Sequence, residues 1–254
     1  MMAEPRNPTA AILIIGNEIL SGRTQDVNVN FIARRLAALG HVLAEVRIIP
    51  DIPERIIGAV NELRAAYDNL FTTGGIGPTH DDITSECVAA AFGVPWERQP
   101  ETWELMARYF GENFNEARQR MATMPRGAIP IPNSLSLAPG FTIGNVHVMA
   151  GVPSIMQAMF TALEPKLPRG RPIAMRAIYG LGLKEGSIAA GLAAIQAKYA
   201  RTDLGSYPFA REWGSGVAIV AKGTDEAALE AAIGEVEDLI ASQQVTPVRG
   251  EPGL

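Results

Sequence analysis

The first two thirds of the chain alternate short apolar runs with segments whose apolar residues recur at helical spacing. The run Ala10–Ile15 is rich in β-branched residues and ends at Gly16, as expected of a buried parallel strand. The further strands that we expect are His41–Ile49, Asn69–Thr73 and Val146–Ala150, and the helices are Val27–Leu39, Pro53–Ala66 and a segment from Asp82 through Ala91. This alternation predicts an α/β fold with a parallel sheet between two layers of helices.

Ligands of such sheets bind beyond the carboxyl ends of the strands. The loops that follow Ile15, Ile49, Thr73 and Ala150 are therefore expected to meet at one edge. A region with two weaker helical patterns, Glu101–Phe110 and Glu112–Met124, is expected to lie at the surface.

The chain is expected to contain two domains. Prolines, glycine and basic residues cluster between Pro165 and Pro172, a composition typical of a linker. Beyond it the pattern changes to strand, helix, strand, strand, helix, which predicts a small α+β domain. We place the α/β domain at 1–167, the small domain at 172–242 and a frayed tail at 243–254.

Composition excludes several classes of protein. The 254 residues include 22 Lys+Arg and 27 Asp+Glu, a net charge of −5, so a general nucleic-acid binder with a basic face is not expected. The single cysteine, Cys87, excludes an internal disulfide framework and a multi-cysteine metal site. The longest apolar run is too short to cross a bilayer, and the first residues do not resemble a signal peptide. We expect a cytoplasmic protein with no membrane partner.

The segment from Thr72 to Thr84, TTGGIGPTHDDIT, carries the most chemical information. Its three glycines allow the backbone to approach a ligand closely, and their amides could bind a phosphate. The adjacent Asp81 and Asp82 would repel a bare phosphate, but they suit a phosphate that is bridged by Mg²⁺ or another divalent cation. The alternative is a tight turn in which an aspartate caps the next helix with help from Thr79.

This segment and others resemble the family of molybdopterin-binding domains, most closely the amino-terminal region of CinA, the competence/damage-inducible protein. The matching positions are Gly16, Glu18 and Gly22 with Asp26 and Asn28, then Asp51, then the string from Gly74 to Thr84, and in the trailing segment Tyr179–Glu185 and Gly205–Pro208. The resemblance implies a three-layer αβα domain followed by a small domain sometimes called KH-like.

The resemblance also implies a function. It suggests a Mg²⁺-dependent pyrophosphatase, a hydrolase that acts on ADP-ribose or a related dinucleotide, with Asp82 and Asp81 as catalytic and metal-binding residues. The other residues expected to bind substrate or phosphate are Gly16, Glu18, Gly22, Asp26, Asn28, Asp51, Thr73, Gly74, Gly75, Gly77, Pro78, Thr79, Thr84, Gly151, Pro153 and Ser154. Members of the family form homo-oligomers, and we expect one here.

Two differences from the family limit this prediction. Ile155 stands where the family usually has glutamate after the last strand, which removes a carboxylate. The sequence ends before the amidase domain of full-length CinA proteins, so amidase activity is not expected.

Two other functions stay open. One is molybdopterin binding or adenylylation, as in MoaB and MogA, and the other is a nucleotide- or pterin-binding module without catalysis. A nucleic-acid role of the small domain is disfavoured because it lacks a Gly-x-x-Gly loop flanked by basic residues.

Several single residues have a structural and a functional interpretation. Asp26 could cap the helix that begins near Val27, and Ser21 could close a local turn. His80 is more commonly an exposed loop residue than a catalytic acid, and Cys87 is expected to be a buried, inert thiol. Arg118 and Arg120 could close over phosphates or belong to a solvated helical face.

Overall fold

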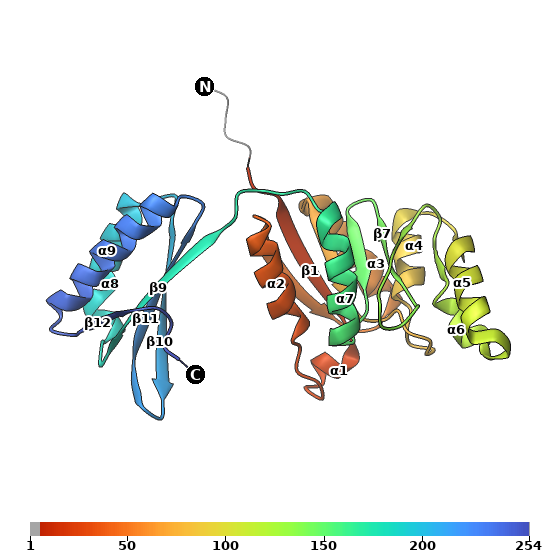
Figure 1. The fold of residues 1–254 in the computed structure, drawn as a ribbon, viewed down its shortest axis with the longest axis horizontal. Coiled ribbons are helices and arrows are strands. Elements are labelled where there is room, and N and C mark those ends of the chain that lie inside the picture. Colours follow the sequence, from red (N-terminus) through yellow and green to blue (C-terminus); the bar gives the residue numbers. More distant parts are fainter. Residues whose placement is uncertain (1–5, 254) are drawn as a thin grey trace, which may run out of the picture. The chain divides into compact units, whose positions relative to one another are not determined.

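A computed structural model describes residues 6–253 of the chain. The chain divides into two compact units between Gly170 and Arg171, inside the segment predicted as a linker. Figure 1 labels the elements of both units. None of the helices in the described range is long and apolar enough to cross a membrane.

The larger unit is built on a six-stranded sheet with the order β2-β1-β3-β8-β7-β6. Neighbours among the first four strands are parallel, and the last two strands join the sheet antiparallel. The strands are β1 (Thr9–Ile15), β2 (Val42–Ile49), β3 (Asn69–Thr73), β8 (Val146–Met149), β7 (Gly140–Ile143) and β6 (Ile129–Ile131). The carboxyl ends of the four parallel strands therefore lie at one edge, as predicted.

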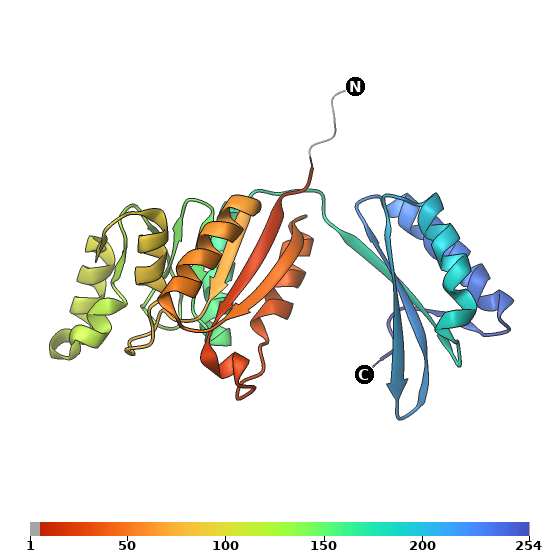
Figure 2. The same ribbon diagram turned by 180° about the vertical axis from the view of Figure 1, so that it is seen from behind.

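Both faces of this sheet are covered by helices, because both faces of the central strand β1 are apolar. Ala11, Leu13 and Ile15 pack with α3 (Pro53–Ala66) and α4 (Thr84–Phe92). The alternate residues of β1 pack on the other face with α2 (Asn28–Ala38) and α7 (Pro153–Leu163). Figures 1 and 2, seen from opposite sides, show the two helical layers in turn. The predicted three-layer αβα arrangement is confirmed.

The region after α4 differs from the prediction. The helix α5 (Pro100–Phe110) is present, but the second expected helix, Glu112–Met124, is wrong over most of its length. The chain there forms a single turn η1 (Gly111–Asn113) and the short α6 (Glu116–Arg120). It then enters β5 (Thr123–Pro125), which pairs antiparallel with β4 (Trp96–Arg98). This pairing satisfies the backbone groups that a helix would otherwise have used.

The smaller unit has a four-stranded sheet with the order β10-β11-β9-β12 and two helices on one of its faces. Its elements are β9 (Ala174–Leu181), α8 (Glu185–Lys198), β10 (Asp203–Arg211), β11 (Gly214–Gly223), α9 (Glu226–Ser242) and β12 (Pro247–Arg249). Ile178, Val217 and Ile219 pack beneath the helices in a core of their own. The predicted α+β composition is confirmed.

The tail was expected to fray from Gln243, and this is wrong for residues 247–250. Val248 pairs with Tyr179 on the outer edge of β9, and the Gly250 amide donates to the Ala177 carbonyl oxygen at 2.8 Å. Arg249 also pairs with Glu230 and Glu237 on α9. An unpaired strand edge and two carboxylates therefore hold a segment whose composition alone is typical of a loop.

Candidate functional site

A cleft of about 990 Å³ lies at the carboxyl edge of the parallel strands. Its described lining residues run from Ile15 to Met159, so all of them belong to the larger unit. The chain leaves β1 toward β2 on one side and places β3 on the other side, which makes the gap between β1 and β3 the switch point of the sheet. The segment Thr72–Thr84, called the motif from here on, contains three glycines. The first two, Gly74 and Gly75, follow β3 at this switch point.

Only glycine fits at these two positions. Gly74 has φ +102°, and a Cβ there would lie 2.0 Å from the Ile15 carbonyl oxygen. Gly75 has φ +68°, and a Cβ there would lie 2.1 Å from Thr84 Oγ1. The loop thus packs directly on the end of β1 and on the start of α4, and its backbone borders the cleft.

The amides of this loop do not all serve the same purpose. The Gly74 amide donates to the Met149 carbonyl oxygen at 3.2 Å, so it extends the sheet and is not available to a phosphate, contrary to our expectation. The amides of Gly75, Ile76 and Gly77 donate to no acceptor in the part of the chain that the structure describes. Three consecutive amides without partners at a cleft can bind an anion.

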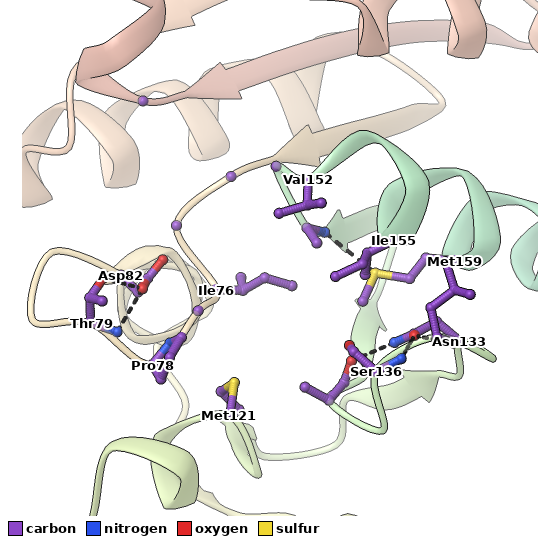
Figure 3. A pocket seen from close by; sticks show the side chains of 18 of the residues that line it. Ile76, Pro78, Thr79, Asp82, Met121, Asn133, Ser136, Val152, Ile155 and Met159 are labelled. Carbon is purple, nitrogen blue, oxygen red and sulfur yellow. Dashed lines mark hydrogen bonds between the residues drawn. The ribbon is translucent and has the colours of Figure 1, made fainter. Parts of the chain in front are cut away.

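The acidic end of the motif is held by Thr79. Its amide donates to Asp82 Oδ2 at 2.8 Å, and its hydroxyl lies 2.5 Å from both Asp81 Oδ1 and Asp82 Oδ2. The hydroxyl lowers the pKa of Asp81. Neither aspartate caps α4, because the residue at that helix start is Ile83 and no side chain caps it. Figure 3 shows Thr79 and Asp82 together on one wall of the cleft.

Two further carboxylates border the same cleft from neighbouring strands. Asp51, after β2, accepts a hydrogen bond from the Asn17 amide at 2.8 Å, at the start of α1 (Asn17–Leu20). Burial raises the pKa of Asp51, and the nearby charges of Glu18 and Asp81 raise it further. Glu18 folds back over Gly16, where a Cβ would meet its carboxylate at 2.6 Å.

The cleft therefore has an unbalanced charge. The described residues that line it include four carboxylates and no lysine, arginine or histidine. Arg120 lies behind the motif, where it donates to the Asp82 carbonyl oxygen at 3.3 Å, and it does not line the cleft. Arg118 donates to the Asn113 carbonyl oxygen and stacks over Phe110. Neither arginine therefore neutralises the carboxylates.

The donor set fits a cation that is shared with a ligand. No three His, Cys, Asp or Glu side chains between residues 6 and 253 come together as a metal site. Asp81 and Asp82 supply carboxylate oxygens beside the unpaired amides, and Mg²⁺ typically combines one or two carboxylates with phosphate oxygens and water. The residues present suit Mg²⁺ held jointly by protein and phosphate, and do not suit a metal held by protein alone.

Most of the residues predicted from sequence are brought together at the cleft. Those that line it are Gly16, Glu18, Asp51, Gly74, Gly75, Gly77, Pro78, Thr79, Asp81, Asp82, Gly151 and Pro153. Those that do not line it are Gly22, Asp26, Asn28, Thr73, Thr84 and Ser154.

The second group acts on the loops or lies apart from them. The side-chain amide nitrogen of Asn28 donates to the Gly151 carbonyl oxygen at 2.8 Å and so fixes the turn after β8. Asp26 lies one residue before Val27, the N-cap of α2, so it is not the N-cap that was considered; its Oδ1 accepts from the Val29 amide at 2.9 Å in the first turn of that helix. Thr84 is buried beneath Gly75, and its amide donates to the Gly75 carbonyl oxygen. Gly22 and Ser154 are exposed outside the cleft.

The residues of the opposite wall of the cleft were not predicted from the sequence. It is a loop, residues 133–138, together with the end of α5 and the side chain of Met121. Asn133 Oδ1 accepts from the Leu135 and Ser136 amides, and its amide nitrogen donates to the Ala138 carbonyl oxygen. An Asn-Ser pair after proline is a turn signal that could have drawn attention to this loop. Figure 3 shows Asn133 and Ser136 facing the motif across the cleft.

Apolar side chains lie between these two walls. Ile76, Ile155 and Met159 line the cleft, and Figure 3 shows all three in its interior. Tyr109 and Phe110, which pack edge to face at 5.0 Å, line it from the end of α5. One part of the cleft is thus acidic and rich in amides, and the other part is apolar and aromatic.

Other residues that the sequence singled out lie elsewhere. His80 is exposed and does not line the cleft. Cys87 is buried in α4, and burial raises the pKa of its thiol to about 11, as expected of an inert cysteine. Ser21 donates to the Glu18 carbonyl oxygen and closes the local turn after α1.

Comparison with known proteins gives matches to both units. The family described as "Probable molybdopterin binding domain" matches residues 11–169. The family described as "FAD synthase, middle domain" matches residues 172–249.

Relatives extend these matches. A curated protein of Pyrobaculum calidifontis is 34% identical over 212 residues, which cover 79% of this chain and 81% of that protein. A CinA-like protein of Parasynechococcus marenigrum is 40% identical over 167 residues, which cover 62% of this chain and 40% of that protein. The crystal structure of the protein CinA, of unknown function, from Thermoplasma acidophilum has a TM-score of 0.60 at 30% identity. It covers 63% of this chain and 98% of that chain.

Proposed function

The chain belongs to the molybdopterin-binding domain family as a CinA-like protein, and from this membership and its acidic cleft we propose that it is a Mg²⁺-dependent nucleotide pyrophosphatase. The substrate class is ADP-ribose or a related dinucleotide. The observation that carries the proposal is that loop amides without hydrogen-bond acceptors lie in one cleft with four carboxylates. None of the described lining residues is basic, so no side chain there balances these charges. A phosphate alone would be repelled there, whereas a phosphate with its cation neutralises the site.

Each part of the cleft has a role in this proposal. The amides of Gly75, Ile76 and Gly77 bind the oxygens of the pyrophosphate. Asp82 and Asp81 hold the cation, with Asp82 oriented by the amide and hydroxyl of Thr79. When bound, Mg²⁺ supplies Lewis-acid polarisation of a phosphoryl oxygen and lowers the pKa of an attacking water.

In this proposal Asp51 is the proton acceptor. Its pKa is raised by burial, and its Oδ2 is fixed by the Asn17 amide, so Oδ1 can take the proton that the attacking water loses. In the hydrolysis, a bond forms between the water oxygen and one phosphorus while the anhydride bond breaks. The leaving phosphate carries away the electron pair of that bond.

The test replaces one carboxylate of the motif. Asp82→Asn should reduce Mg²⁺-dependent hydrolysis of ADP-ribose at least about a hundredfold, because the amide binds the cation poorly. Asp238→Asn, at an exposed position in α9 outside the cleft, is the matched control and should keep the parent rate. Thermal unfolding of both variants checks that the fold is intact. Equal rates for Asp82→Asn and the parent would refute the assignment.

A second function is favoured by the apolar part of the cleft. Tyr109, Phe110 and Met121 could pack against a pterin as well as against a nucleotide base, which fits molybdopterin binding or adenylylation. Calorimetry with ADP-ribose, FAD and ATP, with and without Mg²⁺, separates these possibilities. FAD is included because the smaller unit matches a domain of FAD synthase. Binding without turnover of any of the three would favour a non-catalytic binding module.

A further inference from the structure

A second cavity, of about 320 Å³, lies in the larger unit and shares no described lining residue with the cleft. It borders the beginnings of β3 and β8, whereas the cleft borders the ends of the same strands. Its described lining combines apolar residues of β6 and of the end of α7 with polar residues that include Asn69, Thr142, His147 and Lys166. The volume lies in the range of small-molecule sites in proteins.

A chain of hydrogen bonds crosses one wall of this cavity. The Thr142 hydroxyl lies 3.0 Å from His147 Nδ1, and His147 Nε2 lies 3.2 Å from Asn69 Oδ1. Because Asn69 Oδ1 can only accept, the hydrogen of the neutral imidazole is on Nε2, and Nδ1 accepts from the hydroxyl. Burial lowers the pKa of His147 to about 4, so the imidazole is neutral near pH 7. Both ring nitrogens are thus fully used within the protein.

The chain of hydrogen bonds ends on a donor that has no partner. Asn69 is 5% exposed, and its amide nitrogen finds no acceptor among residues 6–253. A buried donor without a partner is energetically unfavourable. Asn69 borders the cavity, but its side-chain nitrogen has almost no accessible surface of its own, so a small rotation of the side chain is needed for this amide to donate to an oxygen atom bound there.

The other lining residues indicate the charge and the polarity of a ligand that would fit this cavity. Lys166, in the turn η2 (Glu164–Lys166), is exposed, and it is the cationic side chain among the described lining residues once His147 is neutral. No carboxylate belongs to that lining. The other walls are mainly aliphatic, from Ile129, Ile131 and Leu167.

We propose that this cavity binds a small carboxylate with an apolar body. One carboxylate oxygen accepts from the Asn69 amide, the negative charge faces the Lys166 ammonium, and the apolar body packs against the aliphatic walls. The proposal does not depend on the activity of the cleft, because the two sites have no lining residue in common.

The test uses hexanoate as the probe and the side-chain amide signal of Asn69 as the reporter, followed by ¹H–¹⁵N NMR on the full chain. Hexanoate should shift this signal with saturation, while hexylammonium, which has the same body and the opposite charge, should not. Hexanamide, which keeps the carbonyl oxygen without the charge, should bind at least about fivefold more weakly. The backbone amide of Gly75 reports whether any probe enters the cleft instead.

Two variants separate the roles of the polar groups. Lys166→Gln, at an exposed position, should weaken hexanoate at least about fivefold, and Lys184→Gln, an exposed lysine of the smaller unit, should leave it unchanged. Asn69→Asp replaces the donor by an acceptor, and should abolish binding if the variant folds. The proposal is overturned if hexanoate leaves the Asn69 signal unchanged, if hexanamide or hexylammonium binds equally well, or if Lys166→Gln binds as the parent does.

Discussion

At the scale of single residues, two glycines of the larger unit should respond to alanine in opposite ways. Gly58 is exposed inside α3, and a Cβ there would meet no atom within 4 Å. Gly58→Ala should therefore raise the free energy of unfolding by about 0.5–1 kcal/mol, because alanine is the better helix former. Gly74→Ala should lower it by about 2 kcal/mol or more, since its φ is positive and its Cβ would clash with Ile15. Urea unfolding measures both, and a neutral Gly74→Ala would contradict the loop geometry.

His147 should make the larger unit sensitive to acid. Its pKa is lowered to about 4 in the folded protein, chiefly by burial, whereas an unfolded histidine titrates near 6.5. Between these values the unfolded state binds more protons, so stability is present above pH 6.5 and is lost as the pH falls toward 4. From pH 7 to pH 4.5 the loss that this histidine causes should be about 2 kcal/mol.

The comparison that isolates this effect is His147→Gln. The carboxylates titrate in both proteins, so the difference between their stability losses over the same pH interval reports His147. Urea unfolding at pH 7 and at pH 4.5 gives the four values that are needed. Equal losses in parent and variant would show that His147 is not the group responsible.

The residues of the site were predictable where a motif required them and not where packing chose them. Asp81 and Asp82 stand beside three glycines, a pattern with a chemical meaning of its own. Asn28 belongs to another string that matches the family, yet its side chain donates to the Gly151 carbonyl oxygen and does not line the cleft, a contact set by how the start of α2 meets the turn after β8. The engagement of the Gly74 amide by Met149 likewise depends on the neighbouring strand, which no local pattern reveals.

At the scale of elements, the helix α3 and the buried parallel strands were predicted closely, and the short strands β4 to β7 were missed. The bounds of α3 and β3 agree with the sequence, because Pro53 starts one and a fully buried run forms the other. The strands β4 to β7 have only three or four residues each, and Pro125 and Pro130 interrupt their pattern. Such strands exist because a neighbour pairs with them, so their evidence lies in tertiary structure.

The end of α5 should determine recognition of the base, if the proposed function holds. Tyr109 is 69% exposed and lines the cleft beside Phe110. Stacking of a base on an aromatic ring contributes about 1–3 kcal/mol, so Tyr109→Ala should raise the KM for ADP-ribose about tenfold with little change in kcat. Tyr207→Ala, an exposed tyrosine of the smaller unit, is the control and should leave the KM unchanged. Steady-state kinetics tests this, and an unchanged KM in Tyr109→Ala would place the base elsewhere.

At the scale of the whole molecule, the division into two units rests on separate cores. The larger unit has two apolar clusters on either side of its sheet, and the smaller unit has a third that includes none of their residues. Each unit can therefore bury apolar surface without the other, which is the physical condition for folding alone. The change of element pattern after Pro165 predicts a division of this kind.

This separation predicts that the fragment 1–170 keeps the properties of the cleft. Every described residue that lines the cleft lies between Ile15 and Met159, so removing residues 171–254 removes none of them. The fragment should unfold in one cooperative transition, and should bind ADP-ribose with Mg²⁺ with a Kd within about threefold of the full chain, because the lost residues contribute no contact to the ligand. Calorimetry on fragment and full chain measures this directly. A fragment that folds but binds more than tenfold more weakly would mean that the smaller unit contributes to the site, and that the cleft as described is only part of it.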